Sequence, residues 1–384
     1  MKIFKNNVFY IGLLSFFGGI SQDIFVPILP LYLTEILGMD KSFVGVSAGL
    51  VIAAASIFKI VSGYLSDNFK KKPIIFSGYF LSMVGRAFLA FFTSGAAVLG
   101  LRFIDGVGKG MKDAPKDALI ANSTEQENRG RNFGIARALD TFGSVIGPLL
   151  LAWLLIIFRD SLFKYHVIIL LSAIPIIFTL LILIFKVKED NIAKKEKLSF
   201  SGKLPLSYYL FLSIMVIFSI GNFSDAFLIL RASNLGLGLI AIPLVYALFN
   251  FTYALSSIPL GGLSDRIGRE KVIILGWVAF TLSYLGFALA NSAWQVWFIF
   301  AFYGLYYATT EGVAKAYIAD MVTKENRGKA YGIYNAAIGL VALPANVLAG
   351  LLWDKINPSA PFFFGAIASG FSVILMIILI WKKH

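Results

Sequence analysis

The sequence contains no cysteine and only two histidines, His166 and His384, among its 384 residues. The missing cysteines exclude disulfides and thiolate metal sites, and two isolated histidines do not predict a metal centre or a histidine proton relay. Charged residues make up 14% of the chain, whereas a soluble domain carries roughly 25%. No G-x-x-x-x-G-K-[ST] nucleotide loop occurs, so direct use of ATP is not expected. We expect neither a bound cofactor nor an enzymatic activity.

Apolar residues are in surplus instead. They account for 58% of the chain, the mean hydropathy is +0.80, and phenylalanine occurs 36 times. A helix that crosses a bilayer needs about 20 mostly apolar residues, and the apolar runs here are long and continuous, unlike the alternating strands of a membrane β-barrel. An all-α polytopic membrane protein is therefore predicted. Its twelve transmembrane helices are expected over residues 8–37, 42–65, 73–93, 95–121, 131–158, 165–187, 206–232, 237–263, 271–290, 293–320, 329–353 and 360–381.

Lysine and arginine are distributed unequally between the two ends of these helices. Most of them lie near both termini and in every second loop, whereas the other loops have little beyond Lys41, Arg159, Lys164 and Lys355. The positive-inside rule places both termini and the 187–205 loop in the cytoplasm. The net charge of +13 then reflects membrane topology, and nucleic acid is not expected as a partner. We expect the cytoplasmic (inner) membrane of a prokaryote, with membrane lipids as partners.

The sequence also repeats itself. Two pairs of segments match at one offset of 198 residues: GYLSDNFKKKP (63–73) with GLSDRIGREK (262–271), and ENRGRNFGIA (127–136) with ENRGKAYGIY (325–334). A constant offset over two separate matches indicates two parallel halves, which is a known transporter architecture. The repeat predicts six-helix bundles over 1–187 and 206–384, joined by a cytoplasmic linker at 188–205.

These motifs resemble those of the major facilitator superfamily. The G-x-L-S-D sequence lies between the second and third helices and again between the eighth and ninth, and LRFIDGVG (101–108) resembles the R-x-x-x-G-x-G pattern of the family's fourth helix. GSVIGP (143–148) resembles the fifth-helix pattern associated with proton-driven exporters. The resemblance covers nearly the whole chain. It implies a monomeric secondary transporter with two rocking halves and the cavity lined by the first, fourth, seventh and tenth helices.

The predicted fourth helix carries its charges on one face. At 100° per residue, seven of them fall within an arc of about 140°: Arg102, Asp105, Lys109, Lys112, Asp113, Lys116 and Asp117. A charge at the bilayer centre costs from about 2.5 kcal/mol upward, so this face is expected to point at other helices or a wet cavity. We assign Arg102, Lys109, Lys112 and Asp113 as substrate-binding candidates. The alternative is an internal ladder of i,i+4 pairs, such as Asp105 with Lys109 and Lys109 with Asp113.

Each of the four helices that the resemblance places around the cavity carries a carboxylate: Asp23, Asp105, Asp225 and Glu311. Proton coupling requires a carboxylate whose pKa changes between a dry and a water-filled cavity. These four are therefore the proton-coupling candidates, and the alternative for each is that it only neutralises a neighbouring base. The other substrate-binding candidates on these helices are Asn222, Tyr303, Tyr307 and Lys315, the last of which could pair with Glu311.

The resemblance also implies gating residues. In the family, Asp67 and Asp265 brace one access state, and the second loop copy keeps the full D-R-x-G-R continuation, whereas the first copy lacks it. The complete set of gating candidates is Gly63, Asp67, Gly261, Asp265, Arg266, Arg269, Gly143, Gly147 and Pro148. Elsewhere, Arg137 and Asp140 are expected to pair at i,i+3, and Arg231 is expected to snorkel towards the interface.

We therefore expect a small molecule to be moved by alternating access and driven by the proton gradient. The GSVIGP segment favours export by antiport. The alternative is uptake by symport of an organic anion or zwitterion held by Arg102 and Lys109, and cationic drugs on Asp23 are a further alternative. A non-transporting membrane sensor or scaffold is a hypothesis from another class, although it would not need carboxylates on four cavity helices, and a channel is a third. A metal-ion substrate is not favoured, because cysteine and cavity histidine are both missing.

Overall fold

The computed structural model describes residues 7–124, 129–189, 203–323 and 326–381, with only the backbone described at residues 129–131 and at Glu311. Within these ranges all regular secondary structure is helical, as predicted. The helices are α1 (Asn7–Leu31) with the π-helical turn η2 (Tyr32–Ile36), α2 (Lys41–Asn68), α3 (Lys71–Phe88), α4 (Gly95–Asn122), α5 (Arg129–Ile157), α6 (Lys164–Phe185), α7 (Leu206–Gly221), α8 (Ala226–Asn234), α9 (Ala241–Ile267), α10 (Arg269–Leu289), α11 (Ala293–Met321), α12 (Arg327–Lys355) and α13 (Ala360–Trp381).

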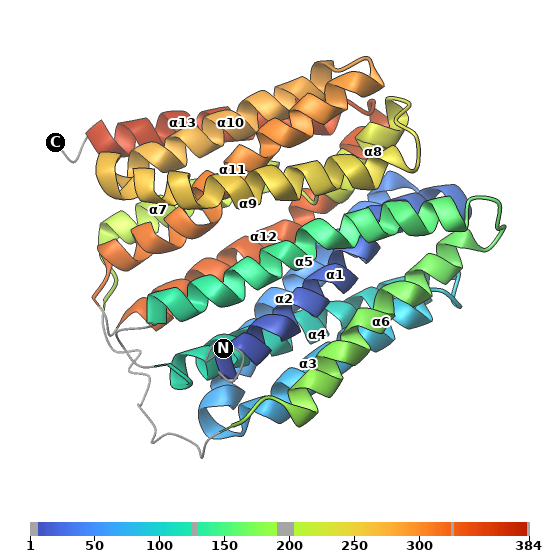
Figure 1. The fold of residues 1–384 in the computed structure, drawn as a ribbon. Helices are drawn as coiled ribbons and strands as arrows, with labels where there is room; N and C mark the ends of the chain where they lie inside the picture. Colours follow the sequence, from blue (N-terminus) through green and yellow to red (C-terminus); the bar gives the residue numbers. More distant parts are fainter. Residues whose placement is uncertain (1–6, 125–128, 190–202, 324–325, 382–384) are drawn as a thin grey trace. The chain divides into compact units, whose positions relative to one another are not determined.

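These helices form twelve spans, because η2 continues α1 and α8 continues α7 (Figure 1). Within the described ranges, nine spans are long and apolar enough to cross a membrane by length and composition alone. The other three, α3, α4 and α11, carry ionised residues inside their apolar sequence. Ionised residues within a span face the protein interior or water rather than lipid, so these three helices are where a functional site is expected.

The seventh span corrects the sequence prediction. Residues 206–232 were expected to form one continuous helix, but the structure ends α7 at Gly221 and starts α8 at Ala226. Asparagine, serine and aspartate side chains compete with helical hydrogen bonds, and all three occur between these two residues. The freed Ser224 N–H is bound by the Asn346 Oδ1 atom of α12 at 2.8 Å. An interruption at membrane depth needs such a partner, and it is typical of a binding site.

The chain divides into two compact units. Unit 1 holds α1, α3–α6, residues 50–68 of α2 and residues 241–247 of α9. Unit 2 holds α7, α8, α10–α13, residues 41–49 of α2 and residues 248–267 of α9.

The two units use the same helix pairings. In unit 1, α1 packs on α5 and α6, while α3 packs on α4 and α6. In unit 2, α7 packs on α12 and α13, while α10 packs on α11 and α13. Each helix in the second set follows its counterpart by six spans, so the sequence repeat corresponds to a repeat of packing (Figure 1).

Arg231 also corrects a prediction, because its side chain does not snorkel. The residue is buried near the end of α8, and its guanidinium donates to the carbonyls of Phe287 at 3.0 Å and Ala290 at 2.8 Å. It also binds Asn234 Oδ1 at 2.6 Å. The last carbonyls of a helix lack intrahelical partners, so Arg231 supplies donors to the C-terminal end of α10.

Candidate functional site

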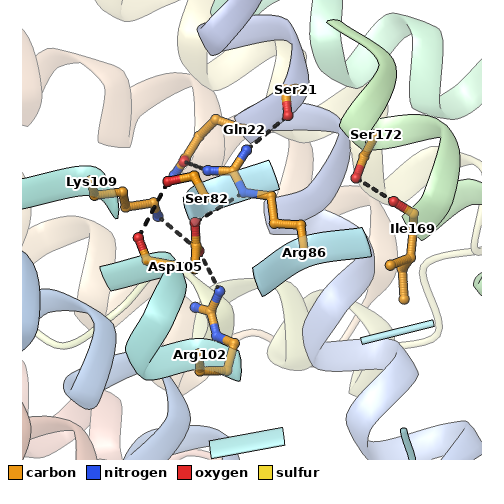
Figure 2. Close-up of polar contacts among 9 residues, drawn as sticks. All are labelled: Ser21, Gln22, Ser82, Arg86, Arg102, Asp105, Lys109, Ile169 and Ser172. Carbon is orange, nitrogen blue, oxygen red and sulfur yellow. Dashed lines mark hydrogen bonds and ion pairs between the residues drawn. The ribbon is translucent and has the colours of Figure 1, made fainter. Parts of the chain in front are cut away.

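A buried group of ionised side chains lies where α3, α4 and α1 meet in unit 1 (Figure 2). Its centre is the Asp105 carboxylate, which is fully buried. It pairs with Arg86 Nε at 3.1 Å, Arg102 Nη1 at 2.9 Å and Lys109 Nζ at 3.8 Å. We call Arg86, Arg102, Asp105 and Lys109 the Asp105 cluster. For Arg102, Asp105 and Lys109 the prediction that the charged face of α4 points at other helices is confirmed, whereas Asp117 on the same face is exposed.

Arg86 connects this cluster to α1. Its Nη1 donates to Ser21 Oγ at 2.9 Å, and its Nη2 donates to Gln22 Oε1 at 2.8 Å. The Phe25 ring lies 5.5 Å from the Arg86 guanidinium carbon and 5.4 Å from that of Arg102. A ring at this distance attracts a cation. Phe25 and the two polar residues of α1 therefore hold guanidinium groups that one carboxylate cannot satisfy alone.

The Asp105 cluster carries more positive than negative charge. Three bases surround one carboxylate. The next base along α4, Lys112, places its ammonium 4.5 Å from the Tyr79 ring centre and forms no ion pair with an acid in the part of the chain that the structure describes. The side chains of Arg102 and Lys109 retain 8% and 20% of their exposure, whereas Arg86 retains 1%. Lys109 is therefore the most exposed base of the cluster and Arg86 the least exposed.

Asp23 lies on α1 next to this cluster, in a different kind of environment. It is buried and hydrogen-bonded by the Ser144 side chain of α5. Among the described residues, no base forms an ion pair with it. Asp140 of α5, Lys109 and Arg86 are near enough to act on it through their charge, the first as a like charge and the other two as opposite charges.

The predicted exporter motif packs directly against Asp23. A Cβ atom on Gly147 would lie 2.9 Å from the Asp23 Cβ, and one on Gly143 would lie 2.2 Å from the Phe16 carbonyl oxygen. Both distances are too short for real side chains, so the two glycines allow the backbones of α1 and α5 to approach each other. Pro148 follows inside α5. The motif thus fixes where the Asp23 carboxylate sits.

Unit 2 has its own polar site at the break in the seventh span. The hydroxyls of Tyr303 and Tyr307 lie 3.2 and 3.5 Å from Asp225 Oδ1. Asn222 Nδ2 donates to the Tyr306 hydroxyl at 2.8 Å. The structure thus brings together four predicted candidates, namely Asn222, Asp225, Tyr303 and Tyr307. The side chain of Glu311 lies outside the described residues, so its predicted pairing with Lys315 stays a prediction.

The two loop motifs differ in structure as in sequence. In the second copy, Arg269 pairs with Asp265 at 3.2 Å and with Asp320 at the end of α11. Gly268 has φ of +99°, a conformation that favours glycine. In the first copy Lys70 holds the equivalent position with φ of −60°, and exposed Asp67 has no partner among the described residues.

The remaining gating candidates have few close neighbours. A Cβ on Gly63 would meet only Ala114, at 3.9 Å, and one on Gly261 would meet nothing within 4 Å. Arg266 is exposed. The expected Arg137–Asp140 pair is present at 3.4 Å on the half-exposed face of α5.

Arg86 and Phe25 are functional candidates that the sequence analysis missed. Arg86 interrupts the apolar sequence LSMVGRAFLA of the third span, and an ionisable residue within a span is a site candidate by default. That signal was available. Phe25 carries no such signal, because it is one of 36 phenylalanines and only the tertiary structure places it beside two guanidiniums. Conversely, the predicted Lys109–Asp113 pair is wrong: Lys109 binds Asp105 instead.

Comparisons with known proteins agree with this architecture. The family described as the Major Facilitator Superfamily matches residues 11–230 and 209–384. The uncharacterized MFS-type transporter MJ1317 of Methanocaldococcus jannaschii is 35% identical over 98% of this chain and 95% of its own length. The multidrug resistance protein MdtH of Aeromonas hydrophila is 33% identical over 34% of this chain and 33% of its own length. The class C tetracycline resistance protein of Escherichia coli is 34% identical over 36% and 34%, respectively.

Solved structures share the fold at low sequence identity. A variant of the nucleoside transporter NupG superposes with a TM-score of 0.79 at 15% identity, over 98% of this chain and 99% of that one. A variant of the peptide transporter POT in complex with alafosfalin gives 0.76 at 13% identity, over 98% and 94%. Given the family match and the relative that is 35% identical over nearly its whole length, this chain belongs to the major facilitator superfamily of membrane transporters.

Proposed function

We propose that this secondary transporter exports a small zwitterionic molecule in exchange for protons, with Asp23 as the coupling carboxylate. The observation that carries the proposal is the setting of Asp23. It is a buried carboxylate bonded to a hydroxyl, and it lies where the exporter-type glycines of α5 pack on α1.

The partner of each carboxylate decides whether it can take up a proton. Protonation of Asp105 would leave Arg86, Arg102 and Lys109 without their shared counter-ion, and an uncompensated buried charge is costly. Protonation of Asp23 removes a charge that no base pairs with directly and leaves the hydrogen bond to Ser144 available. Asp23 is therefore better suited to cycle between two protonation states, while Asp105 organises the bases around it.

The substrate class follows from the charges in unit 1. An anionic group fits Arg102 and Lys109, which are less deeply buried than Arg86. A cationic group on the same molecule would compete with the proton for Asp23, and such competition is what exchange requires. The names of the partial relatives, multidrug resistance protein and tetracycline resistance protein, support export without defining this chain's substrate.

The test uses purified protein in proteoliposomes that contain a pH-sensitive dye. Compounds are first selected by their ability to raise the melting temperature, from a panel of amino acids, tetracycline and aliphatic dicarboxylates. A transported compound should move protons in the opposite direction. Asp23→Asn should abolish proton movement, weaken binding of the compound and remove the pH dependence of the binding that remains, whereas Asp160→Asn, at an exposed position, should behave like the wild type. Unchanged proton movement in Asp23→Asn would remove Asp23 from the mechanism.

Symport of a simple organic anion is the second candidate, and one observation favours it. The Asp105 cluster is net positive and acts on Asp23 through charge. A proton on Asp23 therefore makes the region more positive and strengthens the binding of an anion, and the anion strengthens proton binding equally. The sign of the pH dependence separates the candidates: exchange requires tighter substrate binding at high pH, whereas symport requires tighter binding at low pH.

A further inference from the structure

A groove of about 750 Å³ lies at one end of unit 1, between the beginning of α3 and the segment that follows α6. It belongs neither to the Asp105 cluster nor to the loop motifs. The residues that line it fall into a basic and an apolar set with one acid: Lys70, Lys72 and Lys188; Pro73, Phe76, Leu183, Ile184 and Val187; and Glu189.

The acid in the groove is already bound by backbone. The Glu189 carboxylate accepts from the N–H groups of Lys71 and, at 3.3 Å, Lys72, which are the first residues of α3. A helix N-terminus has free N–H groups and a partial positive charge, so a carboxylate there is stabilised. Glu189 thus forms no ion pair with a lysine side chain among the described residues, and three lysines against one carboxylate leave the groove net positive.

The lysines of the groove keep their charge. The Lys72 ammonium donates to the carbonyls of Ile184 at 2.8 Å and Val187 at 3.1 Å, which are neutral acceptors. Lys70 and Lys188 are exposed at the edge, and neither forms an ion pair among the described residues. Three ammonium groups thus line one groove, and its single carboxylate, Glu189, accepts hydrogen bonds from the backbone of α3.

The apolar part of the groove leads onto the outer surface of the helices. Phe76 stacks on Phe80 at 6.1 Å, and Phe80 is 43% exposed one turn further along α3. On α6, Ile184 and Leu181 are each 45% exposed. Large apolar side chains exposed on a membrane-spanning helix are expected to face acyl chains, so the groove joins a basic end to a lipid-facing surface.

We infer that this groove binds an anionic phospholipid, whose phosphate lies among Lys70, Lys72 and Lys188 and whose acyl chain follows Phe76 and Ile184. Basic pockets between membrane helices are suited to such headgroups. A soluble phosphate would use only the lysines and a neutral lipid only the apolar wall, whereas an anionic phospholipid uses both. The site is independent of the transport proposal.

The experiment measures lipid binding to the purified full-length protein in neutral detergent by native mass spectrometry. The probes are phosphatidylglycerol, phosphatidylcholine with the same acyl chains, and glycerol 3-phosphate. The variant is Lys70→Gln/Lys188→Gln. The matched control is Lys186→Gln/Lys271→Gln, which removes two exposed lysines that do not line the groove. Lysines near an anionic headgroup contribute about fivefold each in affinity, so the groove variant should bind phosphatidylglycerol roughly 25-fold more weakly.

The control variant should stay within about twofold of the wild type, and phosphatidylcholine should bind much more weakly than phosphatidylglycerol to both. Three results would overturn the inference. The first is an equal loss in the groove and control variants, and the second is equal affinity for the two lipids. The third is binding of glycerol 3-phosphate as tight as that of phosphatidylglycerol, which would make the groove a site for soluble phosphates.

Discussion

The Asp105 carboxylate is surrounded by three bases from two helices, and its removal should be costly. We expect Asp105→Asn to lower the free energy of unfolding by about 3–5 kcal/mol, because it removes the carboxylate that the buried Arg86 and Arg102 share. Denaturant unfolding of the purified protein in detergent measures the change.

An exposed pair supplies the control for this substitution. Arg159 and Asp160 lie 3.4 Å apart with exposed fractions of 73% and 90%, and such pairs contribute little. Asp160→Asn should therefore leave stability within about 1 kcal/mol of the wild type. Equal stability of Asp105→Asn and the wild type would show that the buried bases find other partners. Asp105 would then not be the residue that stabilises the cluster.

At this scale the sequence predicted local partners and missed distant ones. The pairing of Asp105 with Lys109 could be predicted from the helical spacing, because i,i+4 neighbours are fixed by the helix itself. The contact with Arg86 could not, because it depends on how α3 packs on α4. The wrong Lys109–Asp113 pair has the same cause. Helical spacing allows Lys109 to pair with either Asp105 or Asp113, and only the packing of α3 and α1 favours Asp105.

At the scale of elements, the α1–α5 contact depends on glycine. A Cβ on Gly143 would lie 2.2 Å from a backbone oxygen of α1, so Gly143→Ala must push the two helices apart. We expect a loss of about 1–3 kcal/mol in stability and a loss of transport, because Asp23 moves with α1. Thermal unfolding and flux in proteoliposomes measure the two effects.

Gly134 is a matched control in the same helix. A Cβ there would meet nothing within 4 Å, and alanine is the better helix former by up to about 1 kcal/mol. Gly134→Ala should therefore leave transport intact and keep or raise stability. If Gly143→Ala did the same, close packing at the exporter motif would have no functional role.

Most helix boundaries could be predicted from the sequence, because apolar runs separated by polar loops determine the spans. The break between α7 and α8 could not, because Asn222, Ser224 and Asp225 are too few to interrupt the apolar pattern of the run. Its backbone is completed by Asn346 from α12, which is distant in sequence.

At the scale of the whole molecule, membrane orientation is still an expectation from the distribution of bases. The positive-inside rule places Lys271 in the cytoplasm and Lys355 outside. The chain has no cysteine, so single replacements can be labelled without background, and both positions are exposed. We expect a membrane-impermeant maleimide to label Lys355→Cys in intact cells and Lys271→Cys only after lysis. The reverse pattern would invert the assigned orientation.

The repeat is preserved in helix pairing but not in loop chemistry. In unit 2 the start of α10 is held by the ion pair of Arg269 with Asp320, whereas in unit 1 the start of α3 is held by Glu189. The common architecture could be predicted from the constant offset between matching segments. The different restraint in unit 1 could not, because Glu189 lies in the segment after α6, outside both matches.

Asp105 has a further consequence for the transport cycle. In the proposed exchange the protein returns without its cargo and with a proton on Asp23, and cations without a counter-ion at membrane depth would oppose that return. The ammonium of Lys109 lies 3.8 Å from the Asp105 carboxylate, which serves as its counter-ion once the cargo has left. Lys109 can thus pair with the anionic group of the substrate in the loaded form and with Asp105 in the form without substrate. The conformational change of that second form then does not expose an unpaired ammonium.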